Sequence, residues 1–174
     1  LFMGAGAVLH ATGTAELETL GGLSKRMPRT AICFLIGAVA IAGLPPLNGF
    51  ISEFFIYFGA FTALRAPIQA ATGAVLTIAV MAAIGTLASA CFAKAFGAVF
   101  LGEPRSAKCA AAHEAGPLMV FAMAMPAAAC VLIGFASPLL LAPLSSAISC
   151  GFDPRLWLEF TAAAGTPLLY ISAG

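Results

Sequence analysis

The sequence is poor in charged residues. Only 9% of its 174 residues are Asp, Glu, Lys or Arg, whereas 61% are hydrophobic and the mean hydropathy is +1.04. Soluble globular domains carry about 25% charged residues, so the composition excludes an ordinary soluble domain and predicts a membrane protein. The formal net charge is only +1. Charge therefore favours neither a nucleic-acid partner nor a role for an acidic tail.

Recognisable catalytic and ligand-binding motifs are also missing. The sequence has no glycine-rich phosphate loop, no nucleophile elbow and no dinucleotide fingerprint. Its cysteines form no C-x-x-C pair and show no spacing typical of zinc or iron–sulfur ligation, so they are interpreted as small apolar helix residues. These are Cys33, Cys91, Cys109, Cys130 and Cys150. We predict no cofactor, no metal site and no self-contained active site.

The beginning of the chain lacks the features of a targeting segment. Residues 1–9 are apolar, without a basic leader or a small-residue cleavage site. We therefore expect the chain to start inside a helix and to be the C-terminal part of a longer polytopic protein. There is no long internal repeat and no linker, so residues 1–174 are predicted to form a single membrane domain fragment.

Charged residues divide the chain into apolar segments. About 20 mostly apolar residues are needed to cross a hydrocarbon core of about 30 Å. The fold class predicted is all-α, a polytopic transmembrane helix bundle with one discontinuous helix. Its parts are a helix end at 1–11, a broken helix at 30–64, helices at 71–101 and 117–144, and a tail at 151–174, with polar loops at 12–29 and 102–116.

The discontinuous helix is interrupted at about residues 43–49, whose sequence is GLPPLNG. Proline removes helix hydrogen bonds, and glycine permits unusual torsions. The break is assigned to Gly43, Pro45, Pro46, Asn48 and Gly49, and a direct ion-ligand role for Asn48 stays open.

Residues 30–64 have two possible topologies, a hairpin or one interrupted crossing. If residues 30–64 cross the membrane once, both polar loops lie on the same side of it. That side then carries five basic residues, and the opposite side carries two. Because basic loops are enriched on the cytoplasmic side, this count favours one discontinuous helix with loops 12–29 and 102–116 cytoplasmic. The side with five contains Lys25, Arg26, Arg29, Arg105 and Lys108, and the other contains Arg65 and Arg155.

Glu53 is the only acidic residue between Glu18 and Glu103, and it follows the break. A carboxylate at bilayer depth is costly and usually binds or relays an ion or proton. Unwound backbone inside a membrane also marks ion sites in transporters. Glu53 is therefore predicted to be a proton relay; the alternatives are a fixed ion pair or a shallower, hydrated carboxylate.

Two further ionisable residues are weaker candidates for the relay. Lys94 lies seven residues before Leu101, so it either extends its ammonium to the interface or joins a buried proton path. His10 carries an imidazole, a group that suits a proton shuttle, but a histidine at a helix end is also a common polar cap. The loop pairs Glu16 with Glu18 and His113 with Glu114 are interpreted as solvated or partner-facing.

Five runs of sequence together resemble a known family. They are HATGT at 10–14, LGGLSKRMP at 20–28, GLPPLNGFISE at 43–53 and CFAKAFG with FLGEPRS between 91 and 106. They are similar to the antiporter-like membrane subunits of complex I, Mrp antiporters and membrane-bound hydrogenases, in particular the branch of hydrogenase-4 component B and formate hydrogenlyase subunit 3. The resemblance covers residues 1 to about 140 and is that of a C-terminal fragment.

The resemblance implies a role for Glu53, because the family carries a lysine or glutamate just after the break. It also matches His10 to a family histidine. Family lysine and glutamate residues of earlier helices lie ahead of the matched region. We expect a proton-translocating subunit without redox centres in a hydrogenase or NADH:quinone oxidoreductase assembly of the inner membrane, contributing an exit-side half-channel. The alternatives are an Mrp-type cation/proton antiporter subunit and a truncated, non-transporting anchor.

Overall fold

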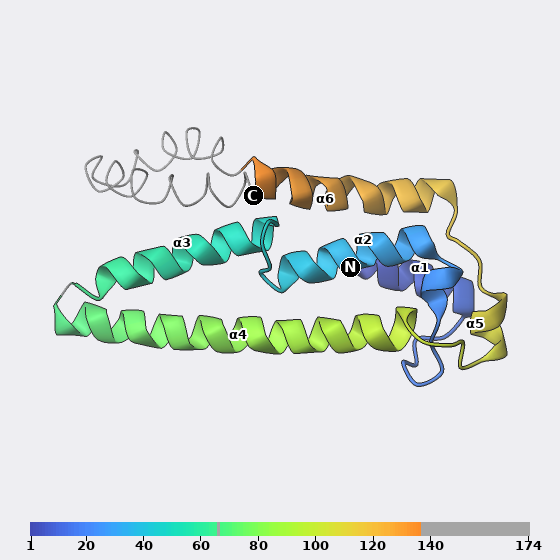
Figure 1. Cartoon of the computed structure of the whole chain (residues 1–174), viewed down its shortest axis with the longest axis horizontal. Coiled ribbons are helices and arrows are strands. Elements are labelled where there is room, and N and C mark those ends of the chain that lie inside the picture. Colours follow the sequence, from blue (N-terminus) through green and yellow to red (C-terminus); the bar gives the residue numbers. More distant parts are fainter. Residues whose placement is uncertain (66, 137–174) are drawn as a thin grey trace. The chain divides into compact units, whose positions relative to one another are not determined.

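A computed structural model describes residues 1–65 and 67–136 of the chain (Figure 1). The predicted tail at 151–174 and the end of the 117–144 segment lie outside this range. Within it all regular structure is helical, so the predicted all-α class is confirmed. The elements are α1 (Phe2–Thr12), η1 (Leu23–Lys25, a 3₁₀ turn), α2 (Pro28–Ile41), α3 (Asn48–Ala63), α4 (Ile68–Phe100), α5 (Ala107–Ala111) and α6 (Pro117–Phe135).

Glycine and proline mark the ends of these helices. Gly13 has a left-handed φ of +67° and donates its N–H to the Leu9 carbonyl at 2.8 Å, which closes α1. Pro28 begins α2, where its missing N–H costs nothing. Gly43, with φ +66°, follows the end of α2, and Pro45 prevents the helix from resuming at once. The break predicted from the sequence is therefore present, as the interval between α2 and α3.

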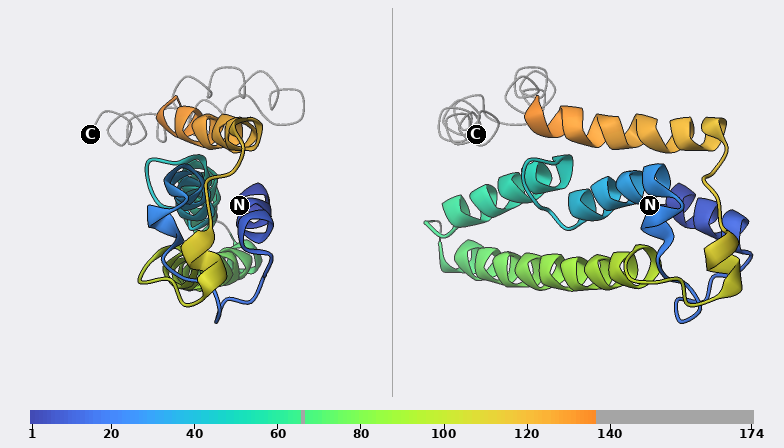
Figure 2. Two further views of the ribbon diagram at one scale, coloured as in Figure 1. Left: turned by 90° about the vertical axis from the view of Figure 1, so that its right-hand side faces the viewer. Right: turned by 45° about the vertical axis from the view of Figure 1, so that its right-hand side comes forward.

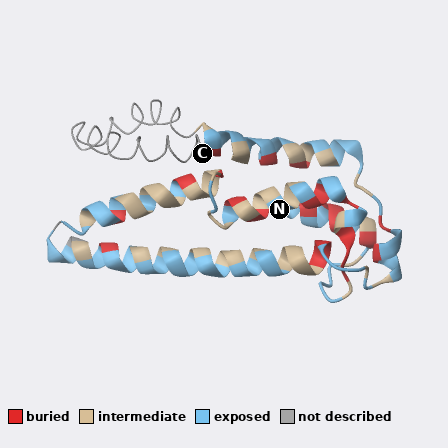
Figure 3. Ribbon diagram, in the orientation of Figure 1, coloured by how far each residue is buried: buried red, intermediate tan, exposed pale blue. Residues whose placement is uncertain are grey.

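The chain forms two compact units. The first comprises Leu1–Ala42 and Gly85–Cys130, and the second comprises Gly43–Ile84 and the chain from Val131. In the first unit α1 lies beside α2 (Figure 2). Buried side chains gather there around the polar loops (Figure 3). Phe100 is fully buried and stacks on Phe96, with ring centroids 5.2 Å apart.

Helix lengths separate two kinds of segment. α4 and α6 are long and apolar enough to cross a membrane. α2 and α3, with 14 and 16 residues, reach only about 21 and 24 Å at 1.5 Å per residue, short of a core of about 30 Å. α4 leaves Leu76 and Leu87 exposed by 65% and 71%. Such apolar exposure suits contact with lipid or with other membrane helices.

Candidate functional site

The carboxylate of Glu53 packs against the backbone of the helix break. Glu53 lies in the second turn of α3 and is half-buried. A methyl group at Gly43 would stand 2.6 Å from the Glu53 Cδ and 2.7 Å from its Oε1. A side chain at residue 43 would therefore have to displace the Glu53 carboxylate, whose flexible stem can turn away. Gly43 thus has two functions, the left-handed turn that ends α2 and the space that Glu53 occupies.

The side chain of Asn48 is a second polar group in the same unit. Its Oδ1 is buried and has no hydrogen-bond partner among the described residues. Buried polar atoms are usually paired, so an orphaned one calls for an explanation. The sequence assigns Asn48 and Gly49 to the break, but the structure has them in the first turn of α3. The Asn48 amide is therefore held by a helix and not by a loop.

The residues around Glu53 on α3 are aromatic. Phe54 lies with its ring centroid 6.1 Å from that of Phe50 and 6.2 Å from that of Phe58, while Ile51 is buried. These rings give the α3 segment an apolar surface. Low polarity strengthens the interaction of any charge with the few polar groups nearby.

The two weaker candidates belong to the other unit. Lys94 lies in the last two turns of α4 and His10 in the last turn of α1, and both side chains are exposed. The positions of both residues are described only relative to other residues of the first unit. Their assignment to the relay remains a prediction.

The two polar loops contact each other within the first unit. Lys25 forms an ion pair with Glu103 at 3.2 Å, and the Gly22 N–H donates to the Leu101 carbonyl at 3.0 Å. The Cys109 thiol donates to the Thr19 carbonyl at 3.4 Å. Loops 12–29 and 102–116 therefore meet at the same end of this unit. The sequence predicts both as polar loops but indicates neither η1 nor α5 inside them.

Glu114 caps the start of α2 from a distant part of the chain. Its Oε2 accepts from the Arg29 N–H at 2.8 Å, and its Oε1 accepts from the Thr30 hydroxyl at 2.6 Å and the Thr30 N–H at 3.4 Å. The interpretation of Glu114 as solvated or partner-facing is wrong. The sequence holds one signal: Met27 precedes Pro28 and offers no side-chain cap, so the free N–H groups of α2 need another acceptor.

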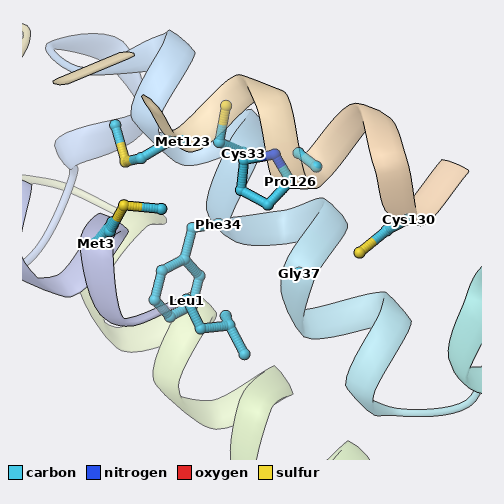
Figure 4. A pocket seen from close by; sticks show the side chains of 10 residues that line it. Leu1, Met3, Cys33, Phe34, Gly37, Met123, Pro126 and Cys130 are labelled. Atoms are coloured by element: carbon cyan, nitrogen blue, oxygen red, sulfur yellow. The ribbon is translucent and has the colours of Figure 1, made fainter. Parts of the chain in front are cut away.

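Two pockets of the first unit have no charged side chain in their lining. A small pocket of about 80 Å³ lies among α1, α2 and α6, where Met3, Cys33, Met123 and Cys130 line it with sulfur (Figure 4). A larger one, of about 340 Å³, lies between α1, the loop after it and the end of α4 and is almost wholly apolar. Neither is lined by a carboxylate, a histidine or a basic side chain. Among the described helices α1, α2, α3, α4 and α6, the one carboxylate is that of Glu53, close to the break.

Comparison with known proteins finds a family model that matches the N-terminal part of the chain. Residues 1–78 match the family described as NADH:quinone oxidoreductase/Mrp antiporter, transmembrane. The matched region includes α1, α2, the break and Glu53. The resemblance inferred from the sequence is confirmed: the matched segment is similar to this transmembrane family.

Curated relatives extend the similarity beyond residue 78. Hydrogenase-4 component B of Escherichia coli is 42% identical over 138 residues, which is 79% of this chain and 20% of the relative. Formate hydrogenlyase subunit 3 of the same organism is 40% identical over 156 residues, 88% of this chain and 26% of the relative. A Na(+)/H(+) antiporter subunit of Alkalihalophilus pseudofirmus is 32% identical over 160 residues, 91% and 30%. The chain thus spans about a fifth to a third of the length of these relatives.

Proposed function

We propose that this chain is part of a proton-translocating membrane subunit of a redox-driven complex of the hydrogenase or NADH:quinone oxidoreductase type. It contributes an exit-side half-channel, and other subunits carry out the electron chemistry. Its partners are the membrane and peripheral subunits of that assembly and the lipid bilayer. Similarity to hydrogenase-4 component B and formate hydrogenlyase subunit 3 supports this assignment.

The observation that carries the proposal is the packing of the Glu53 carboxylate on Gly43. The break supplies backbone carbonyls outside any helical ladder, and such carbonyls are able to accept a hydrogen bond from a protonated carboxyl. The orphaned Asn48 Oδ1 is a second acceptor in this unit, suited to a water molecule or a protonated group. Glu53 therefore has the acid–base chemistry of a relay and a polar backbone beside it. His10 and Lys94 are retained as candidate supporting groups.

The contacts between the two polar loops support the predicted topology. Lys25 with Glu103, and Thr30 with Glu114, join loops 12–29 and 102–116 at one end of the first unit. Loops on one side require an even number of crossings between them. Because α4 is one crossing, residues 30–64 supply the other. We propose an inner-membrane protein with both loops cytoplasmic, in line with their basic residues.

The relay role is tested in the intact, assembled complex with Glu53→Gln and Glu53→Asp. Gln keeps the size of the side chain and removes its proton exchange, so proton translocation per electron turnover is expected to fall to background. Asp keeps the carboxyl group, so Glu53→Asp is expected to retain part of the proton translocation. Normal translocation in a fully assembled Glu53→Gln complex would refute the relay.

An Mrp-type cation/proton antiporter subunit is the second candidate, because the Na(+)/H(+) antiporter relative matches 91% of this chain. Proton movement that requires Na⁺ and continues without electron transfer would favour this candidate. A truncated, non-transporting anchor is the third, and an open reading frame without upstream membrane helices would favour it.

A further inference from the structure

α6 approaches the helix break through a glycine. A methyl group at Gly134 would stand 2.8 Å from the carbonyl carbon of Pro46 and 2.9 Å from the Leu47 Cα, and it would also overlap the Pro46 carbonyl oxygen. These are backbone atoms, so no side-chain rotation relieves the overlap. Gly134, Pro46 and Leu47 all belong to the second unit. α6 therefore rests on the break because residue 134 has no side chain.

The same short segment supports Glu53 at its other end. Gly43 lies against the Glu53 carboxylate, while Pro46 and Leu47 lie against Gly134. Close backbone approach is not general for glycines of this unit, because a methyl group at Gly59 or Gly73 would meet nothing within 4 Å. The two tight contacts coincide at residues 43–47. This segment is held from α3 on one side and from α6 on the other.

We propose that Gly134 is a positioning residue for Glu53. It lets α6 fix the backbone of residues 43–47, on which the Glu53 carboxylate rests. The inference depends on the proposed relay function of Glu53, but Gly134 itself has no side chain that could exchange a proton. Proton transfer is sensitive to sub-ångström placement of the groups involved, so a displaced break impairs transfer without removing any ionisable group.

The experiment uses the intact complex with Gly134→Ala, with Gly59→Ala and Gly73→Ala as controls that add the same methyl group to open positions. Two quantities are measured: proton translocation per electron turnover, and the rate at which dicyclohexylcarbodiimide modifies Glu53. Both are normalised to assembled complex. Glu53→Gln gives the background of the labelling.

Gly134→Ala is expected to lower translocation by about tenfold to a hundredfold, the effect of a misplacement of about 1 Å. It is also expected to raise the Glu53 labelling rate severalfold, because the carboxylate loses its packing on Gly43. The two control variants should match the native complex in both measurements. A purely structural role does not predict a change in labelling of the normally assembled complex.

Each alternative result has a distinct meaning. Unchanged translocation and labelling in Gly134→Ala, with Glu53→Gln inactive, would overturn the positioning role and leave the relay intact. Normal translocation in Glu53→Gln would overturn the relay itself. Failure of Gly134→Ala to assemble, while the controls assemble, would make Gly134 a folding determinant and also overturn the inference.

Discussion

Replacing Glu114 by Gln should destabilise the end of the first unit where the polar loops meet. The first N–H groups of a helix have no intrahelical acceptor, and here the Glu114 carboxylate serves Arg29 and Thr30. Thr30 is fully buried, so its hydroxyl cannot turn to water if the acceptor is lost. Glu114 also accepts from the N–H of Ala115 at 3.3 Å. One carboxylate thus connects the loop, the start of α2 and a buried hydroxyl.

The expected magnitude follows from these bonds. A hydrogen bond to a charged group contributes about 1.5–3 kcal/mol, and a helix N-cap about 0.5–2 kcal/mol. Gln keeps one oxygen for Thr30 but presents an NH₂ group to the other donor, so Glu114→Gln should cost about 1–2 kcal/mol. Glu114→Ala removes every acceptor and leaves the Thr30 hydroxyl unpaired, so it should cost about 2–4 kcal/mol.

The assay is equilibrium unfolding of the assembled complex in detergent, followed by helical circular dichroism in rising concentrations of SDS. Glu103→Gln is the matched control, because its ion pair with Lys25 is exposed by 83% and 72% at the two side chains. Exposed pairs contribute at most about 1 kcal/mol. Thr30→Val completes a double-mutant cycle with Glu114→Gln, where a coupling of about 0.5–3 kcal/mol is expected.

Two outcomes would refute the capping role. One is a cost for Glu114→Gln no larger than that for Glu103→Gln. The other is strict additivity of Glu114→Gln and Thr30→Val, since residues that share a hydrogen bond should not act independently.

Two further predictions concern Gly22 and Lys94. Gly22→Ala should lower the free energy of unfolding by about 1–3 kcal/mol, because Gly22 has φ +66° and a methyl group there would stand 2.7 Å from the Pro104 nitrogen. Its control is Gly97→Ala, which adds the same methyl group in open space on α4 and should leave the free energy of unfolding unchanged or raise it in the same assay. Lys94→Gln should retain most proton translocation in the assembled complex if the exposed ammonium reaches the interface, and a loss as large as that of Glu53→Gln would instead assign Lys94 to the proton path.

Local features of the fold could be read from the sequence, whereas the long-range contacts could not. Gly43 and the two prolines predict the break because their effect on the backbone is intrinsic. Glu114 caps Thr30 although the two residues are 84 positions apart in the sequence. Pro46 contacts Gly134 across 88 positions. Neither pair has a periodicity or a motif. Hydropathy likewise locates a span but does not specify which way a side chain such as that of Lys94 turns.

The length of α4 bears on the two interpretations of Lys94. Its 33 residues extend about 50 Å, and even a tilt of 40° leaves about 38 Å along the membrane normal, more than the core of about 30 Å. At least one end of α4 therefore leaves the hydrocarbon. The loop after Phe100 carries Glu103, whose exposed ion pair with Lys25 of the other polar loop belongs in water or among headgroups. Lys94 lies six residues from Phe100, about 9 Å along the helix, so its flexible stem can bring the ammonium to that interface without a buried partner. Interface extension thus needs no further group, whereas a buried path needs a proton acceptor close to Lys94, and the Lys94→Gln measurement distinguishes the two.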